Sequence, residues 1–134
     1  MSSDLGLIPF KDGKEGPLSS ALVLKVLKPF ILPIDDENWE LSFPDGSGGD
    51  MLPVLEDHDA FGICINRPHG AALFDALYEI MRQTHTLMYW TGSRDMITAD
   101  PSIAEHLPPD YIEIYGMPAL VHSGADILAE IAKT

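Results

Sequence analysis

The chain has 134 residues, of which 46% are hydrophobic, so it has the size of one domain and can bury a core without disulfides. Its formal charge is −13, because 21 acidic residues face only 8 lysines and arginines. A surface this acidic repels nucleic acid and anionic membranes and attracts basic partners, which disfavours direct DNA or RNA binding, so we expect no nucleic-acid partner. The single cysteine, Cys64, cannot form an internal disulfide, which favours the cytoplasm.

Residues 1–16 mix glycines and Pro9 with alternating charge and show no hydrophobic period. This pattern predicts a loose N-terminal arm, followed by a single domain over residues 17–134. The N-terminus lacks the basic and long apolar regions of a secretory signal. The apolar stretch 18–34 is interrupted by lysines and prolines, so we expect no membrane anchor.

Residues 18–28 (LSSALVLKVLK) suit either a helix or a strand. Leu18, Leu22 and Val26 share one helical face, whereas Leu22, Leu24 and Val26 also alternate as in a strand. We favour the helix, which the prolines after residue 28 would end.

Several short segments show the alternation or the β-branched composition of strands. They are residues 39–43, 51–55, 61–66, 86–90 and 111–115. Pro53 confines its segment to a sheet edge, because proline cannot donate a ladder hydrogen bond. The glycine-rich residues 44–50 between the first two segments predict a turn.

Three helices are predicted further along the chain: residues 71–83, a short helix that begins after Asp100, and residues 123–133 capped by Ser123. The helix 71–83 separates two predicted strands and so resembles the middle of a β-α-β unit. We expect an α+β fold, with a small, mostly antiparallel or mixed sheet of about four to five strands and about three helices packed on one face.

The acidity is concentrated between Lys28 and Arg67, a stretch with nine carboxylates and no lysine or arginine. The nine are Asp35, Asp36, Glu37, Glu40, Asp45, Asp50, Glu56, Asp57 and Asp59. Trp39, Phe43 and Phe61 are interspersed among them, which makes the stretch too apolar for a disordered tail. We expect a folded acidic surface.

Neither dense group of polar residues in this stretch matches a metal or phosphate motif. Residues 56–59 (EDHD) are crowded together, whereas metal ligands normally come from spaced positions. The loop DGSGGD at 45–50 has too few oxygen ligands for calcium, and its carboxylates would repel phosphate. We predict turns at both places, no metal site and no cofactor.

No catalytic residue is predicted. Cys64 and Ser123 are potential nucleophiles, but neither lies in a known catalytic motif. Catalysis by Cys64 with His69 or His85 remains an open alternative, because sequence gives no distance between them. The histidines are irregularly spaced and are assigned no role: His58, His69, His85, His106 and His122.

Tyr89 and Trp90 close the predicted strand 86–90. Because strand side chains alternate, we expect one of the two to face the core and the other to face outward. Tyrosine and tryptophan are enriched among the residues that dominate interface binding energy, so the outward ring is a candidate anchor.

Residues 61–92 (FGICINRPHGAALFDALYEIMRQTHTLMYWTG) combine a strand, an Arg-Pro turn, an aromatic-rich helix and an aromatic strand. In this organisation the chain resembles small bacterial immunity proteins, which neutralise toxins delivered by secretion or contact-dependent systems. The resemblance covers about a quarter of the chain and implies a class of partner, a protein toxin, without assigning any residue a role.

We therefore expect a cytoplasmic immunity or inhibitor protein, not an enzyme, that binds a cognate basic toxin. The expected contact residues are the nine carboxylates of the acidic stretch together with Trp39, Tyr89 and Trp90. Two alternatives remain. One is an enzyme that acts through His58 and its neighbouring carboxylates, with or without a divalent metal. The other is an oligomeric accessory module whose acidity serves solubility.

Overall fold

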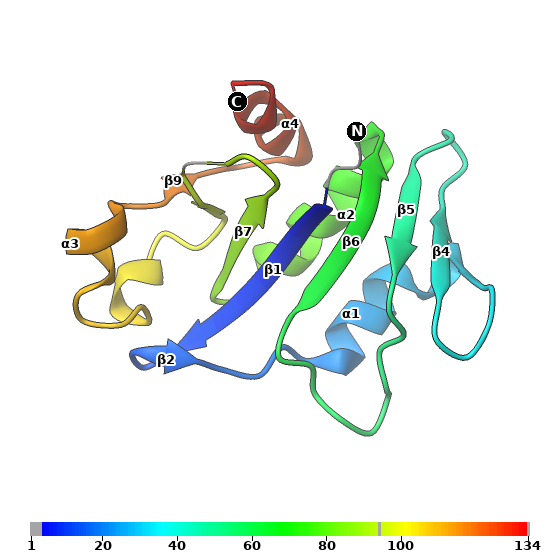
Figure 1. Ribbon diagram of the computed structural model, residues 1–134, viewed down its shortest axis with the longest axis horizontal. Helices are drawn as coiled ribbons and strands as arrows, with labels where there is room; N and C mark the ends of the chain where they lie inside the picture. Colours follow the sequence, from blue (N-terminus) through cyan, green and yellow to red (C-terminus); the bar gives the residue numbers. More distant parts are fainter. Residues whose placement is uncertain (1–3, 94, 134) are drawn as a thin grey trace.

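A mixed β-sheet dominates the computed structural model, which describes residues 4–93 and 95–133 (Figure 1). Its strands are β1 (Asp4–Lys11), β2 (Lys14–Glu15), β3 (Ile31–Pro33), β4 (Trp39–Ser42), β5 (Gly48–Met51), β6 (Ile63–His69), β7 (Thr86–Trp90), β8 (Ile97–Thr98) and β9 (Ala119–Leu120). The helices are α1 (Ser20–Leu27), α2 (Ala71–Met81), α3 (Tyr111–Tyr115) and α4 (Gly124–Ala132), with 3-10 turns η1 (Lys28–Phe30) and η2 (Ile103–Glu105). The strand order is β3-β4-β5-β6-β1-β7-β8-β9, and β2 pairs with β1. Neighbouring strands are antiparallel except β8 and β9, which are parallel.

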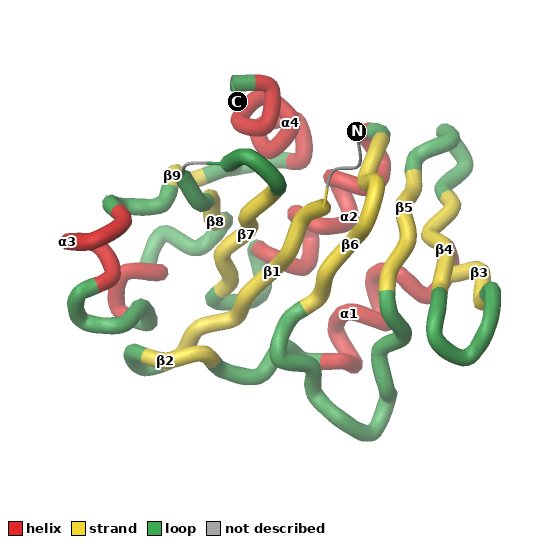
Figure 2. The backbone as a smooth tube through the Cα atoms, viewed as in Figure 1, coloured by secondary structure: helices red, strands yellow, loops and turns green. Residues whose placement is uncertain are grey.

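The expected loose arm is wrong for residues 4–16, because β1 lies in the middle of the sheet between β6 and β7 (Figure 2). Leu5 and Leu7 point into the core and are fully buried. Gly6 and Pro9 interrupt the alternation that would have revealed the strand. Residues 1–3 of the expected arm lie outside the described part of the chain.

The sheet is also larger than expected, with nine strands in the described residues instead of four to five. The strands β2, β3, β8 and β9 have only two or three residues, too few to show a period in sequence. The expected strand 51–55 is displaced, because β5 begins within the predicted glycine turn. A Cβ at Gly49 would lie 2.7 Å from Ile65 Cγ2, so the close approach of β5 to β6 requires this glycine.

The expected strand at residues 111–115 is wrong, because this segment forms helix α3. Its alternation of aromatic and β-branched residues looks like a strand, but only Tyr111 is buried. The Tyr111 and Tyr115 rings, one helical turn apart, pack with their centroids at 4.9 Å.

The remaining long elements are confirmed. Helix α1 settles the ambiguity of residues 18–28, and α2, α4, β4, β6 and β7 lie where the sequence predicts them. Ser123 caps α4 by accepting a hydrogen bond from Asp126 N at 3.0 Å. The predicted β-α-β unit is split, since β1 lies between β6 and β7 and is antiparallel to both.

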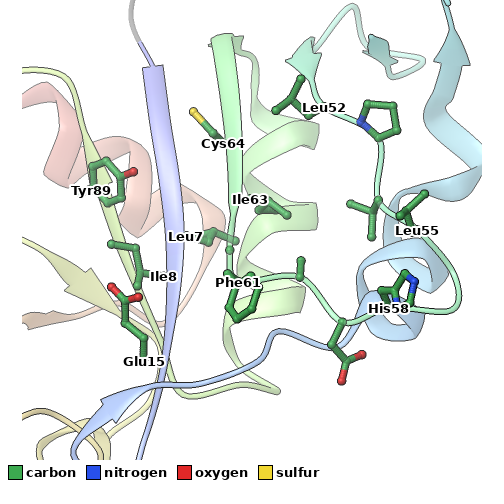
Figure 3. A pocket seen from close by; sticks show the side chains of 15 residues that line it. Leu7, Ile8, Glu15, Leu52, Leu55, His58, Phe61, Ile63, Cys64 and Tyr89 are labelled. Atoms are coloured by element: carbon green, nitrogen blue, oxygen red, sulfur yellow. The ribbon is translucent and has the colours of Figure 1, made fainter. Parts of the chain in front are cut away.

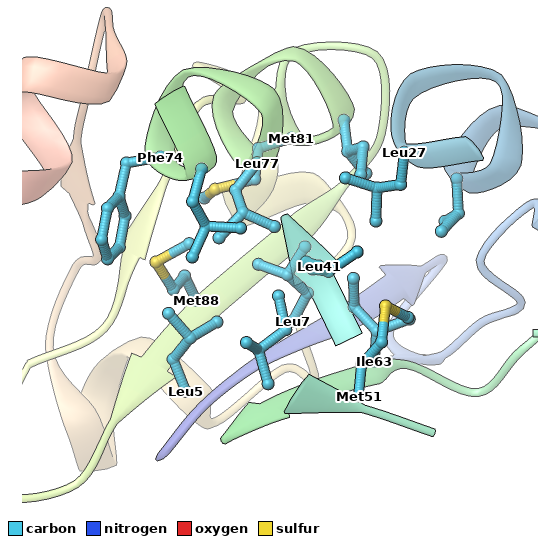
Figure 4. Packing of buried hydrophobic residues seen from close by; sticks show 14 of the residues in the cluster. Leu5, Leu7, Leu27, Leu41, Met51, Ile63, Phe74, Leu77, Met81 and Met88 are labelled. Carbon is cyan, nitrogen blue, oxygen red and sulfur yellow. The ribbon is translucent and has the colours of Figure 1, made fainter. Parts of the chain in front are cut away.

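The main core lies between the sheet and helices α1, α2 and α4. Leu27 and Leu77 from the helices pack among strand residues such as Leu7 and Leu41 (Figure 4). A second cluster, on the opposite face of β1 and β7, is formed with η2 and α3 by Phe10, Leu87, Ile103, Leu107 and Tyr111. The expectation that all helices pack on one face of the sheet is therefore wrong, because η2 and α3 pack on the other face. The second cluster covers just one end of the opposite face.

Candidate functional site

The opposite face of the sheet carries a row of carboxylates. The strand register places the following residues side by side across β3, β4, β5, β6 and β1: Leu32, Glu40, Asp50, Asn66 and Asp4. Directly paired residues of antiparallel strands project from the same face of the sheet. Their chain neighbours Leu41, Met51 and Ile65 are buried on the helix side, so the row faces outward. We call Asp4, Glu40 and Asp50 the acidic row.

One cation lies beside the acidic row. Arg67 Nε donates to Asp50 Oδ2 at 3.0 Å, and its Nη2 contacts the same oxygen. Arg67 has a φ of 52° at an irregularity in the β5–β6 register. Within the described residues, no ion pair to lysine or arginine forms at Asp4 or Glu40, so both keep their charge free for a partner.

The hairpin between β3 and β4 adds exposed charge at one end of the row. Asp35 accepts hydrogen bonds from Glu37 N at 2.8 Å and from Asn38 Nδ2 at 3.2 Å, which fixes the turn. Asp36 and Glu37 are left exposed. The predicted anchor Trp39 is half-buried and packs against the core, so it offers a partner only part of its ring.

Two predicted contact residues instead hold helices in place. Asp45 Oδ2 accepts from Ala72 N in the first turn of α2 at 3.2 Å, and its Oδ1 accepts from Ser47 N at 2.8 Å. The hydrogen bonds from Ser47 and Ala72 keep the pKa of Asp45 below its ordinary value. Asp59 Oδ1 accepts from Ser20 N at the start of α1, at 3.3 Å.

The other carboxylates of residues 56–59 lie in an exposed loop with weak local partners. Glu56 is 3.6 Å from Lys28 Nζ, and Asp57 is 3.7 Å from His58 Nε2. All four side chains are largely exposed, so these pairs contribute little to stability.

A groove of about 450 Å³ lies beside the acidic row, between β1 and the loop 52–62 (Figure 3). Its walls are largely apolar, and its lining includes Ile8, Leu52, Leu55, Phe61, Cys64 and Tyr89, with Glu15, His58 and Asp59 as polar residues. Phe61 is 86% exposed, and Leu52 and Leu55 are also exposed. A folded chain gains nothing from leaving three large apolar side chains in solvent at one place, which makes the groove a candidate contact surface.

The prediction that one of two adjacent aromatic rings faces outward is confirmed. Tyr89 is 37% exposed and lines the groove, whereas Trp90 is 8% exposed and belongs to the core. Trp90 therefore offers a partner little of its surface, and Tyr89 is the outward ring. The Tyr89 ring lies over Gly6 of β1, where any Cβ would overlap it. Gly6 thus shapes this wall of the groove.

Cys64 lies on the groove wall, but its environment disfavours a nucleophile. Burial and the charge of Asp4 raise the pKa of the thiol, so it carries less thiolate than a free cysteine. Of its predicted partners, His69 contacts the carbonyl oxygens of Arg67 and Gly46 through its two ring nitrogens. His85, the other predicted partner, lies in a separate cluster with Asp100 and His106.

Three side chains to which the sequence assigns no metal-binding role come together elsewhere. His85, Asp100 and His106 each offer a potential metal-ligand atom, and these atoms lie within 4.8 Å of one another. Their spacing in sequence matches no ligand motif, so only the fold reveals the cluster. Burial alone would raise the pKa of Asp100, but hydrogen bonds from His85 and Ser102 keep it below its ordinary value.

Comparison of the chain with protein-family models, with curated proteins and with solved structures finds no match. None of the helices in the described residues has the length and apolar character that crossing a membrane requires.

Proposed function

We propose that this chain is an inhibitor of the immunity type, which binds a basic protein toxin through its open sheet face. The observation that carries the proposal is the side-by-side placement of the acidic row and the exposed apolar groove. Carboxylates speed the encounter with a basic partner, and apolar anchors then hold the complex. The partner should present lysines or arginines around one or more apolar side chains.

The contact surface is narrower than the acidic stretch of the sequence. It consists of the acidic row, the exposed hairpin residues Asp36 and Glu37, and the groove with Phe61 and Tyr89. Asp45 and Asp59 are left out because they hold helices α2 and α1. The proposal therefore separates carboxylates that bind a partner from carboxylates that stabilise the fold.

The proposal expects a toxin gene immediately upstream of the gene for this chain, and the test uses the C-terminal domain of the toxin that such a gene encodes. Purified domain and full chain are mixed in a calorimeter at low and high salt. We expect a 1:1 complex whose affinity falls at least tenfold with salt, because the encounter is steered by charge. Co-expression of the full chain should also restore the growth of cells that produce the domain.

Charge reversal locates the surface. The double variant D4K/E40K should weaken binding at least tenfold, mainly by slowing association. E105K/E113K is the matched control, because it makes the same change of charge at two exposed residues on η2 and α3. Equal losses in both variants would mean that net charge matters and the face does not. Absence of any complex would refute the proposed function.

A further inference from the structure

A cluster of two histidines and an aspartate lies at a corner of the sheet remote in sequence from the acidic stretch. His85 is in the turn between α2 and β7, Asp100 follows β8, and His106 ends η2. Other elements hold the backbone there: Phe10 N donates to His85 O at 2.7 Å, and Gly13 N donates to His106 O at 3.0 Å. The β1–β2 hairpin thus fastens both histidines.

The side chains are close and accessible. His85 Nδ1 lies 2.6 Å from Asp100 Oδ2, and the two imidazole rings stack with centroids 3.7 Å apart. The side chains of Asp100 and His106 are 10% and 18% exposed, whereas that of His85 is 43% exposed. Asp100 and His106 are therefore largely enclosed by the fold, whereas solvent reaches the imidazole of His85.

Local structure accounts for only part of this arrangement. Asp100 Oδ1 accepts from Ser102 N at 2.9 Å and from Ser102 Oγ at 2.7 Å, which fixes the turn that leads into η2. Oδ2 is not needed for that turn and faces His85 instead. The turn therefore accounts neither for the position of Oδ2 beside His85 nor for the stacking of the two imidazole rings.

We propose that His85, Asp100 and His106 bind a divalent transition-metal ion of the zinc type. Two imidazole nitrogens and one carboxylate oxygen form a donor set that suits zinc, cobalt and nickel, whereas magnesium and calcium prefer oxygen ligands alone. Three protein ligands leave at least one coordination position for water or for a group from another molecule. The ion would join the turn between α2 and β7, which carries His85, to the segment that carries Asp100 and His106.

Binding requires a defined rearrangement. The rings lie 20° from parallel, and the lone pair of an imidazole nitrogen lies in its ring plane, so the two do not converge on one point. His85 is the more exposed ring and must rotate out of the stack. Metal binding therefore changes the surroundings of His85 more than those of His106.

The test uses the untagged full chain, stripped with a chelator and titrated with zinc chloride in a calorimeter. We expect one zinc ion per chain, a rise in melting temperature on zinc addition and no response to magnesium. Cobalt should give the visible absorption bands of a low-symmetry site. In a ¹⁵N spectrum, zinc should shift the His85 imidazole signals more than those of His106.

H85Q and H106Q should each weaken zinc affinity at least tenfold, and the double variant should lose the melting-temperature response. H58Q and H122Q are the controls, since they remove exposed histidines from other loops and should leave affinity unchanged. Urea unfolding without metal shows whether each variant is folded. No zinc binding by the folded wild-type chain, or equal losses in the controls, would overturn the proposal.

Discussion

Replacement of Phe61 by alanine separates a role in binding from a role in folding. The residue is 86% exposed, so folding hides only about one seventh of its surface. For an aromatic side chain of about 200 Å², that is about 30 Å², or about 0.7 kcal/mol of burial at about 25 cal/mol per Å². The free energy of unfolding should therefore change by less than about 1 kcal/mol.

The expected effect on binding is larger. Burying the remaining surface of about 170 Å² against a partner would contribute at most about 4 kcal/mol, and anchors of this kind cost about 2 to 4 kcal/mol when truncated. Loss of the ring should thus raise the dissociation constant of the toxin complex by a factor of about 30 to 1000.

Urea unfolding measures the first quantity, and calorimetric titration with the toxin domain measures the second. F74A is the control, because Phe74 is 3% exposed in the core and its truncation should cost about 3 to 5 kcal/mol of stability. An F61A variant that binds with unchanged affinity, or that loses more than about 2 kcal/mol of stability, would refute this reasoning.

Two further predictions concern the turn that holds the start of α2. Gly70 has a φ of 94° and a Cβ there would overlap Ser47, whereas Gly46 has a φ of 87° and open space around it. In urea unfolding, G70A should therefore lower the free energy of unfolding by more than about 2 kcal/mol, and G46A by only about 1 to 2 kcal/mol. Equal losses in the two variants would show that the overlap with Ser47 costs nothing. The pKa of Asp45 is lowered from 3.8, so its carboxylate stabilises the fold above about pH 4 and ceases to do so as pH falls through the lowered pKa. D45N should therefore show a shallower loss of stability between pH 5 and pH 2, and an unchanged dependence on pH would count against stabilisation by the hydrogen bonds from Ser47 and Ala72.

Hydrophobic period and capping residues were sufficient to predict most of the longer elements, with β1 as the exception. Helix α2 shows its buried face at spacings of three and four, and α4 begins at a capping serine. Hydrophobic periodicity does not predict a strand correctly where glycine or proline interrupts the alternation, as in β1 and β5. It also misleads where a helix of about one turn has an alternating sequence, as in α3. Strands of two or three residues are decided by their neighbours in the sheet and not by their own sequence.

The acidic surface was predictable in sign but not in detail. Composition locates the charge, but the role of each carboxylate depends on a partner distant in sequence: Ala72 for Asp45, Ser20 for Asp59 and Arg67 for Asp50. Asp4 joins the acidic row only through strand register, far from the acidic stretch in sequence. The cluster of His85, Asp100 and His106 is likewise hidden in the sequence. It forms because the segments before β7, after β8 and after η2 meet, and the β1–β2 hairpin holds the backbone of both histidines.

The central position of β1 has a consequence for the order in which the chain folds. Apart from its short hairpin with β2, this strand pairs only with β6 and β7, so that Leu5 lies opposite Ile65 on one side and Trp90 on the other. This strand therefore has no long partner until β6 has been made, about 60 residues further along the chain, and contacts so distant in sequence slow folding. Until then the core residues Leu5 and Leu7 stay uncovered, so each nascent chain exposes an extended apolar segment to its surroundings.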